Sequence, residues 1–248
     1  MLRRRVEPLA DALYRDLVAQ CPTDAAQEVI VGRAWTLVQT EESSGLMLSG
    51  DLTDVGEEEH HLLLRGRPLV DLAELALSWN GREAGVGMAA INAACNIPSR
   101  FAGCDELNGR DLLLRKATGA RVGVIGHFPW VGDVQKVARV TIFEQQPHAG
   151  DLPSAAQEYL LPDQDVVVIT GSALANKTLP RLLELSRHAW VMLIGPSTPL
   201  SVVLFDYGVD ALAGCVARDA NELADIVREG GGVHAFRQCV RYVTLKKP

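Results

Sequence analysis

The sequence predicts a Rossmann-like α/β domain with a parallel sheet, preceded by a smaller α+β domain. Two observations support this prediction. The second half of the chain contains short continuous apolar runs, which are typical of strands buried on both faces. Helical segments lie between these runs, and alternating strands and helices indicate a parallel sheet with right-handed crossovers. We place the small domain at residues 1–118 and the Rossmann-like domain at residues 119–248.

The composition is that of a soluble globular protein. The 248 residues are 48% hydrophobic and carry a net charge of −7. Because Lys and Arg form no basic stripe, we expect no nucleic-acid partner. The basic cluster at residues 3–5 is followed by no apolar segment, and no apolar run approaches the length of a membrane span. We therefore expect a cytoplasmic protein with no signal peptide and no contact with a membrane.

The elements of the first half follow from local patterns. Apolar residues three and four apart predict a helix over residues 6–17. β-branched and aromatic residues predict a strand over residues 28–38, and a Ser-Ser-Gly turn predicts that residues 45–49 pair back as a hairpin.

Two helices are predicted next, over residues 68–77 and 82–94. The second contains Gly85 and Gly87, and each glycine costs roughly 1 kcal/mol relative to alanine inside a helix. Such a cost indicates that something packs closely against this backbone. A second helix and a ligand explain it equally well.

The second half contains five segments that we interpret as buried strands. They are residues 122–126, 140–143, 165–170, 190–195 and 210–214. A helix is predicted between the third and fourth strands, beginning at Thr178 with Pro180 in its first turn.

The loops that follow these strands are the expected ligand-binding region. In doubly wound sheets, ligands bind beyond the carboxyl ends of the strands, where the strand order reverses. We therefore expect Gly126, Thr170 and Gly195 to lie along one edge of the sheet. Small residues and hydroxyls there fit the close approach of a polar ligand, and helix N-termini favour negative charge. The same residue types also form ordinary turns and caps, so both interpretations stay open.

Few side chains in these loops are reactive. Glu144 follows the first glycine turn at about the spacing at which an acidic residue meets a ribose hydroxyl in dinucleotide sites. The G-x-G-x-x-G pattern is absent, however, so an NAD site is weakly supported. His127 is either a site residue or a structural histidine. The acidic run before His60 and His61 either attracts metal or forms a solvated surface.

Four segments resemble a bacterial and archaeal family described as putative heavy-metal chelation. They are GMAAINA at 87–93, VIGHFP at 124–129, ITGS at 169–172 with Asn176 and Thr178 beyond it, and GPSTPLS at 195–201 with LFDYGVD at 204–210. The resemblance implies a first part similar to the N-terminal domain of enolases and a Rossmann-like second part. It also implies a cleft between them that binds or chelates a heavy metal or a metal-containing small molecule.

The resemblance also implies which residues face this cleft. They are Asn92, His127, Glu144, Thr170, Ser172, Asn176, Ser197, Thr198 and Asp206. The five cysteines show no C-x-x-C spacing, so we expect free thiols and no thiolate site. The expected metal ligands are therefore His127, Glu144 and Asp206, and the expected cofactor is a transition-metal ion.

Three classes of function remain open at this stage. The first is a protein that binds a metal or a metal-containing small molecule. The second is a transferase-like enzyme acting on a small anionic or nucleotide-like ligand, with Glu144 at a ribose. The third is a structural or regulatory oligomer whose loops are only well-capped turns. We also expect a homodimer, because two-fold dimers are the commonest assembly.

Overall fold

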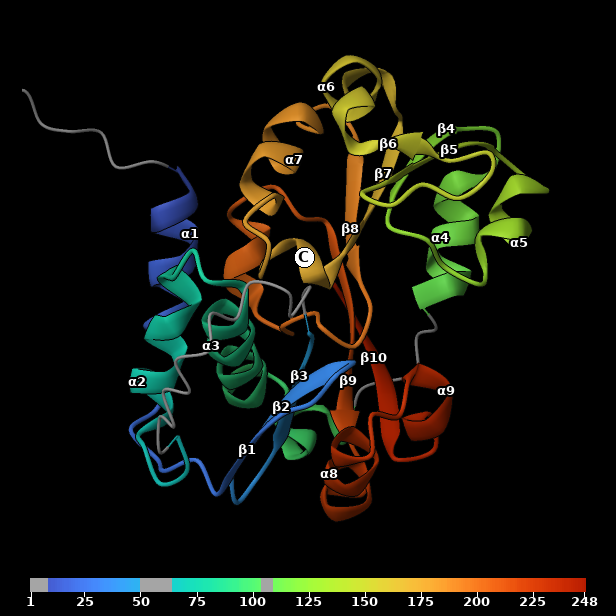
Figure 1. Cartoon of the computed structure of the whole chain (residues 1–248). Coiled ribbons are helices and arrows are strands. Elements are labelled where there is room, and N and C mark those ends of the chain that lie inside the picture. Colours follow the sequence, from blue (N-terminus) through green and yellow to red (C-terminus); the bar gives the residue numbers. More distant parts are fainter. Residues whose placement is uncertain (1–8, 50–63, 104–108) are drawn as a thin grey trace, which may run out of the picture.

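The computed structural model describes residues 9–49, 64–103 and 109–248. It contains a seven-stranded sheet in the order β10-β9-β8-β7-β4-β5-β6 and a three-stranded sheet in the order β1-β2-β3 (Figure 1). Strands β4 to β9 are parallel, and β10 runs antiparallel to β9. The predicted fold class, a mostly parallel sheet preceded by a small α+β unit, is confirmed.

The small sheet follows helix α1 (Leu9–Val18). It consists of β1 (Glu28–Val31), β2 (Trp35–Gln39) and β3 (Ser44–Leu48), all antiparallel. The hairpin between β2 and β3 is confirmed, but the single strand predicted over residues 28–38 is two strands. The chain turns at Gly32, where an added Cβ would lie 2.7 Å from the carbonyl oxygen of Val227. A contact so distant in the sequence leaves no local signal.

Three helical segments complete the first part: α2 (Leu69–Ala73), η2 (Glu74–Leu77) and α3 (Gly81–Cys95). Asn80 caps α3 because its side chain accepts hydrogen bonds from the two backbone N–H groups of residues 82 and 83. A Cβ on Gly87 would overlap the backbone of Ala76 in η2. The segment that packs closely against α3 at Gly87 is therefore another helix, η2.

The large sheet is formed by β4 (Arg121–Ile125), β5 (Arg139–Glu144), β6 (Leu152–Pro153), β7 (Val166–Thr170), β8 (Trp190–Ile194), β9 (Ala211–Ala217) and β10 (Val240–Lys246). Gly126, Thr170 and Gly195 stand at the carboxyl ends of the adjacent strands β4, β7 and β8. Their predicted place along one edge is confirmed. The sequence prediction did not include β6, which has two residues, or β10, which is only partly buried.

The remaining helices cover the sheets. They are η3 (Pro98–Phe101), α4 (Gly109–Ala117), α5 (Val131–Gln135), η4 (Ser154–Ala156), α6 (Gln157–Leu160), η5 (Leu161–Asp163), η6 (Gly171–Ala173), α7 (Leu179–Leu185), η7 (Val202–Phe205), α8 (Ala220–Arg228) and α9 (Val233–Phe236). Helices α4 and α5 pack on one face of the large sheet, whereas α1 and α7 pack on the other.

The two parts of the chain share their cores. One cluster of buried side chains joins α1 and α3 to β7, β8 and β9. Another joins Trp35, Leu37 and Leu46 of the small sheet to α8 and to Phe236 of α9. Helices α8 and α9 are in the lower part of Figure 1. The division at residues 118 and 119 stays a prediction. Helix α4, just before it, packs Leu113 and Ala117 against the large sheet.

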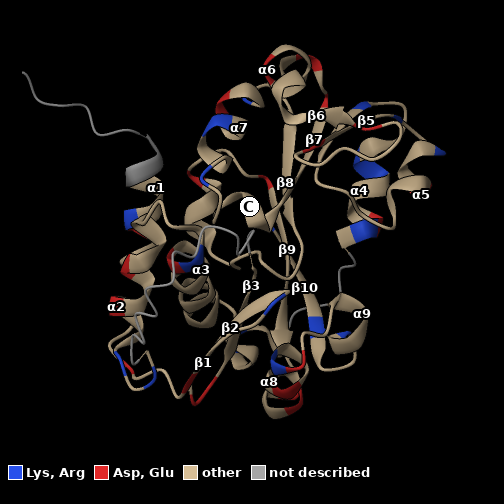
Figure 2. Ribbon diagram, in the orientation of Figure 1, with Lys and Arg blue, Asp and Glu red and all other residues tan. Residues whose placement is uncertain are grey.

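Charges of both signs are interspersed over the described residues (Figure 2), as expected for a protein with no basic stripe. Among the helices in the described ranges, none is long and apolar enough to cross a membrane.

Candidate metal and ligand site

The topology selects one place on the large sheet for a ligand. The chain passes from β4 to β5 and β6 on one side and then returns to β7 on the other side of β4. The strand order therefore reverses between β4 and β7. In open α/β sheets, the crevice beyond the carboxyl ends of two such strands is where ligands bind. Here His127 follows β4, and Thr170 ends β7.

Gly126 follows β4 at this place, and we call the region beyond the carboxyl ends of β4 and β7 the switch crevice. The φ of Gly126, 101°, is a conformation that side chains disfavour. A Cβ at this position would lie 3.3 Å from Cβ of Thr170 and 3.5 Å from the ring of Phe128. An added Cβ would therefore be in tight contact with both side chains, which together with the positive φ explains why glycine occupies this position.

A cluster of three potential metal ligands lies in the loops that follow β4 and β5. The buried carboxylate of Asp151 places Oδ2 3.2 Å from Nδ1 of His127 and 3.6 Å from Nδ1 of His148. The Asp151 side chain is only 2% exposed, whereas the His127 and His148 side chains are 44% and 70% exposed. The backbone N–H of His148 also donates to this carboxylate, at 3.1 Å. The carboxylate is fixed and the imidazoles face outward.

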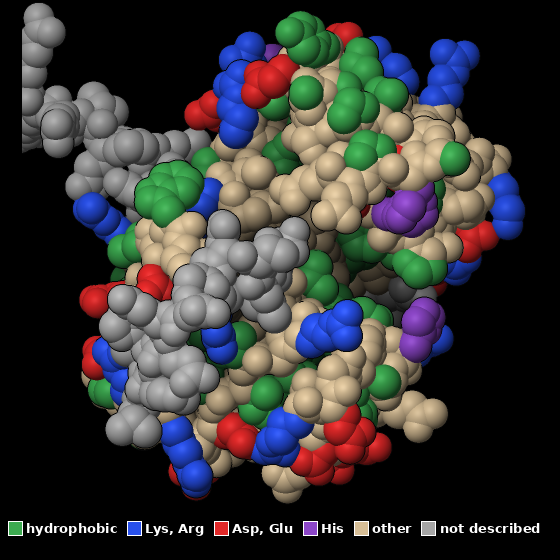
Figure 3. Space-filling view, in the orientation of Figure 1, with side chains coloured by type: hydrophobic (Ala, Val, Ile, Leu, Met, Phe, Trp, Pro, Cys, Tyr) green, Lys and Arg blue, Asp and Glu red, His purple; other side chains and the backbone are tan. Residues whose placement is uncertain are grey.

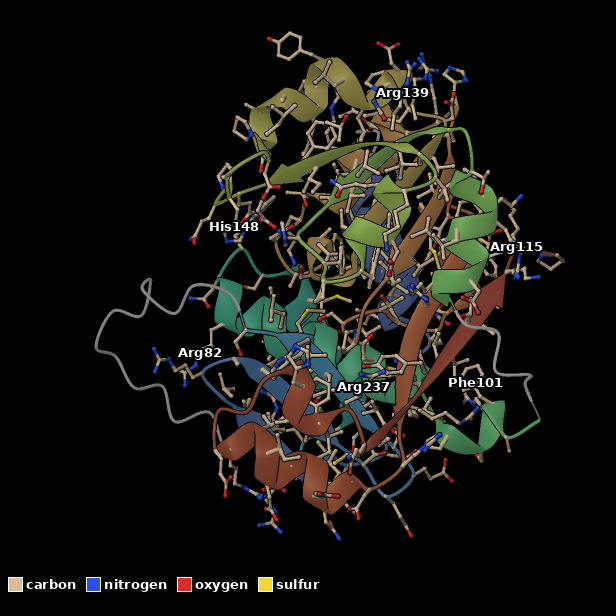
Figure 4. All side chains as sticks on the ribbon, turned by 90° about the vertical axis from the view of Figure 1, so that its right-hand side faces the viewer. Arg82, Phe101, Arg115, Arg139, His148 and Arg237 are labelled. Carbon is tan, nitrogen blue, oxygen red and sulfur yellow. The ribbon has the colours of Figure 1, made fainter. Side chains whose placement is uncertain are left out.

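The geometry of the cluster suits a small cation. One ligand atom from each residue lies within 4.8 Å of the others, and the two imidazole rings meet edge to face with centroids 4.9 Å apart. Among the described residues, this is the only such group of three His, Cys, Asp or Glu side chains. Figure 4 places His148 at the border of the upper part of the molecule, on the same side as Arg82 of α3. Figure 3 shows a hollow between the two parts, beside a histidine side chain.

Hydroxyls and aromatic rings are also found in the loops that follow β7 and β4. The hydroxyls of Thr170 and Ser172 lie 3.0 Å apart, and both residues are half-buried. Phe128 and Trp130 stack with ring centroids 4.7 Å apart. Asn176 lies further along the loop after β7, where its side-chain oxygen accepts hydrogen bonds from the backbone N–H and the hydroxyl of Thr178. It therefore stabilises the start of α7.

The structure brings two of the three predicted metal ligands to the same edge. Glu144 ends β5, next to β4, and its carboxylate accepts a hydrogen bond from the following backbone N–H. Asp206 precedes β9, and the adjacent carbonyl oxygen of Phe205 accepts a hydrogen bond from Lys247, which follows the antiparallel strand β10. Asp206 is therefore at the amino edge of the sheet, away from His127. A position in the sequence does not reveal which edge a loop occupies.

Sequence reasoning missed His148 and Asp151. Both lie in the connection between β5 and β6, which returns toward His127 only in the folded protein. The signal that was available is the spacing of a histidine and an aspartate three residues apart in a loop after a predicted strand.

Asn92, Ser197 and Thr198 lie inside the interface between the two parts, and all three are buried. The Asn92 amide donates to the carbonyl oxygens of Leu46 and Ser197, at 2.5 and 3.1 Å. The Ser197 hydroxyl accepts from the backbone N–H of Leu48 at 2.9 Å. These contacts join β3, α3 and the loop after β8, so this loop connects the two parts. A ligand role for the three residues stays a prediction.

Asn96, one helical turn after Asn92, was also missed. Its amide donates to the carbonyl oxygens of Thr198 and Cys215, and its side-chain oxygen accepts from the backbone N–H of Leu200. The two asparagines therefore hold the same loop from one face of α3. Their spacing of four residues was the available signal.

The described thiols are unsuited to metal binding. Cys21, Cys95, Cys215 and Cys239 are free and buried. Burial raises the pKa of Cys21, Cys95 and Cys215 to about 12, which disfavours the thiolate that binds metals. Cys104, His60 and His61 lie outside the described residues.

Two surface cavities lie away from the switch crevice. One of about 370 Å³ is lined by residues of α4 and α5, with Asp133 between Arg110 and Lys136. The other, of about 240 Å³, is lined by Trp190 and Lys246 at the amino edge of the large sheet. Neither cavity contains a residue of the His127 cluster.

Comparisons with known proteins agree with this two-part α/β architecture. Two family models match, DUF364 over residues 108–246 and DUF4213 over residues 14–95, and both are described as putative heavy-metal chelation. The chain belongs to this family, as the sequence resemblance implied.

Three similar proteins are described as uncharacterized or as having unknown function. An uncharacterized protein of Methanocaldococcus jannaschii is 29% identical over 189 residues, which are 72% of this chain and 71% of that protein. A crystal structure of a protein with unknown function from Desulfitobacterium hafniense DCB-2 has a TM-score of 0.87 and 33% identity, covering 95% of this chain and 98% of that chain. A third protein, from Pyrococcus horikoshii, shares the fold with a TM-score of 0.81 at 18% identity, over 97% of this chain and 100% of that chain.

Proposed function

We propose that the protein binds a divalent transition-metal ion through His127, His148 and Asp151, at the cleft between its two parts. The observation that carries this proposal is the buried Asp151 carboxylate, which lies within 3.6 Å of an imidazole nitrogen from each histidine. The family description, putative heavy-metal chelation, supports it.

The ligand types narrow the choice of metal. Imidazole nitrogen suits zinc, copper, nickel and iron, whereas magnesium and calcium prefer sites made only of oxygen. Three protein ligands leave at least one coordination position open, as in zinc sites that bind water or a substrate. The imidazoles bind metal only when unprotonated, so affinity should fall on acidification.

The test is a titration of purified, chelator-treated protein with Zn²⁺ and Co²⁺, followed by calorimetry and by the visible absorption of cobalt. We expect His127→Ala, His148→Ala and Asp151→Asn each to weaken binding by at least about tenfold, because even residues behind metal ligands contribute that much. The matched control is His234→Ala, which removes an exposed histidine on α9. Equal affinity in wild type and in all three site variants would contradict the proposal.

A second candidate is acid–base catalysis on a small anionic or nucleotide-like ligand. It is favoured by the contact of His127 Nδ1 with the buried Asp151, because this leaves Nε2 free to act as a general base. Thermal shift with adenosine nucleotides in the presence of EDTA tests it. A shift that persists without metal, and that Glu144→Gln abolishes, favours this candidate over metal binding.

A further inference from the structure

The groove between helices α4 and α5 forms a second candidate binding site. The two helices precede the neighbouring parallel strands β4 and β5, and they contact each other on one face of the large sheet. Between them lies the surface cavity of about 370 Å³, which we call the α4–α5 cavity. Its volume is within the range of pockets that bind small molecules. Because no residue of the metal site lines it, metal binding does not explain it.

Two of the residues that line this cavity are apolar. Leu114 of α4 is half-buried and packs on the core beneath the helix, whereas Val137, which follows α5, is 39% exposed. The backbone N–H of Gly119 donates to the carbonyl oxygen of Val137, which holds the end of α5 beside the end of α4. An apolar group placed over Leu114 and Val137 would remove apolar surface from water, which is favourable.

The other lining residues carry an excess of positive charge. Arg110, Arg115 and Lys136 line the cavity together with a single carboxylate, that of Asp133. Three cations and one carboxylate give the lining a formal charge of +2, in a chain whose net charge is −7. Figure 2 shows Lys and Arg residues on both α4 and α5. The site therefore favours an anion, although the protein as a whole is acidic.

Asp133 compensates only part of this charge. Its carboxylate accepts hydrogen bonds from Lys136 at 2.8 Å and from Arg110 at 2.5 Å, and these bonds lower its pKa to about 2. Arg115, in contrast, has no ion pair or side-chain hydrogen bond with any other residue in the described ranges. Figure 4 places Arg115 at the outside of α4. Its guanidinium is therefore the cation of this cavity that has donors to offer to a ligand.

Helix electrostatics explain only one of these features. A basic residue in the last turn of a helix is favourable in itself, because it interacts with the helix dipole. This accounts for Arg115 in the last turn of α4. It does not account for a cavity at this place, or for the exposed Val137 that lines the same cavity.

From these observations we infer that the α4–α5 cavity binds a small amphipathic anion, a molecule with one anionic head and a short apolar body. The head binds the guanidinium of Arg115, and the body covers Leu114 and Val137. A guanidinium binds a carboxylate through two parallel hydrogen bonds, so a carboxylate is the head that suits this site. The inference is independent of the metal site proposed above.

The test uses three probes that separate the head from the body. Hexanoate has both a carboxylate and an apolar chain, acetate has the carboxylate alone, and hexylammonium has the same chain with a positive charge. Each is titrated into chelator-treated protein in the presence of EDTA, and binding is measured by saturation-transfer NMR. We expect hexanoate to bind at least about tenfold more tightly than either of the others, because the burial of two methylene groups is already worth that much.

Two variants locate the binding. Arg115→Gln should weaken hexanoate by at least about threefold, the size expected for an exposed charge pair. Val137→Asn should reduce the preference for hexanoate over acetate, because it removes apolar contact. The matched control is Arg82→Gln, which replaces an exposed arginine on α3 and should bind hexanoate as wild type does. Melting temperatures of the three variants establish that they are folded.

Each outcome decides the inference. Wild-type protein that binds hexanoate no more tightly than acetate or hexylammonium would overturn it. An affinity for hexanoate that is unchanged in Arg115→Gln or in Val137→Asn would also overturn it, because the probe would then bind elsewhere. Since EDTA is present throughout, these results leave the metal proposal untouched, and a protein that binds no metal leaves this inference untouched.

Discussion

Lys177 connects the loop after β7 to the first part of the chain. It is the only described residue other than glycine with a positive φ, 65°. Its ammonium donates a hydrogen bond to the carbonyl oxygen of Ala76 and lies 4.5 Å from the ring centroid of Tyr14. Burial lowers the pKa of Lys177 to about 8. An unfavourable backbone conformation and a desolvated charge are both retained here, in the loop that also carries Thr170 and Ser172.

This lowered pKa predicts how stability depends on pH. The ordinary lysine pKa of 10.5 applies to the unfolded chain, so between pH 8 and 10.5 the unfolded chain binds more protons at this position. The contribution of Lys177 to stability should therefore rise with pH across that window. Urea unfolding of wild type and Lys177→Met at several pH values measures it as a difference between the two proteins. Lys136→Met, an exposed lysine, is the control, and a pH-independent difference for Lys177→Met would contradict the prediction.

The residues of the loop after β8 should respond differently to loss of their hydroxyls. The Thr198 hydroxyl is fully buried and has no hydrogen-bond partner in the part of the chain that is described. Thr198→Val should therefore leave the free energy of unfolding unchanged or raise it by up to about 1 kcal/mol, whereas Ser197→Ala should lower it by about 1–3 kcal/mol by leaving the N–H of Leu48 unpaired. Denaturant unfolding measures both. A loss of about 0.5–2 kcal/mol in Thr198→Val would indicate a cap instead, and a loss of metal binding there would indicate a ligand contact.

At the scale of elements, the sequence predicted the strands that have few polar residues because both of their faces are covered. The five apolar runs became β4, β5, β7, β8 and β9, because a strand covered on both sides has few polar residues. Strand β10 is an edge strand with exposed positions, so its pattern is weaker. The candidate site divides in the same way. His127 and Thr170 were found because they end strands, whereas Asp151 and His148 meet His127 only through tertiary structure.

Alanine substitutions at Gly85 and Gly87 test whether close packing against α3 explains these two glycines. Both are helical, so Gly→Ala should gain about 1 kcal/mol of helix propensity at either position. At Gly85 the nearest atom to an added Cβ is 3.8 Å away, and this gain should be realised. At Gly87 the Cβ would overlap the backbone of Ala76, so Gly87→Ala should instead destabilise the protein by about 1–3 kcal/mol. Thermal and denaturant unfolding of the two variants compare them directly, and a stabilised Gly87→Ala protein would contradict the packing argument.

At the scale of the whole molecule, we expect a two-fold dimer. The outer edge of β10 forms no pair with another strand among the described residues, and Tyr242 on this strand is 46% exposed. Light scattering on protein at tens of micromolar should give about twice the mass of the chain. A monomeric mass at that concentration would contradict the dimer. If the wild type is a dimer and the Tyr242→Asp variant has the same dimeric mass, the assignment of the interface to β10 is wrong.

The side chains that bury one face of the small sheet come late in the chain, so this face stays uncovered for part of the protein's synthesis. Trp35, Leu37 and Leu46 are buried under Leu223, Val227 and Phe236, which come about 180–200 residues later in the chain. At about 5–20 residues per second, a ribosome would need roughly 10–40 s to deliver that cover. During this interval the nascent sheet exposes a tryptophan and two leucines to the cell. We therefore expect the early part of the chain to be exposed to aggregation until α8 and α9 have emerged.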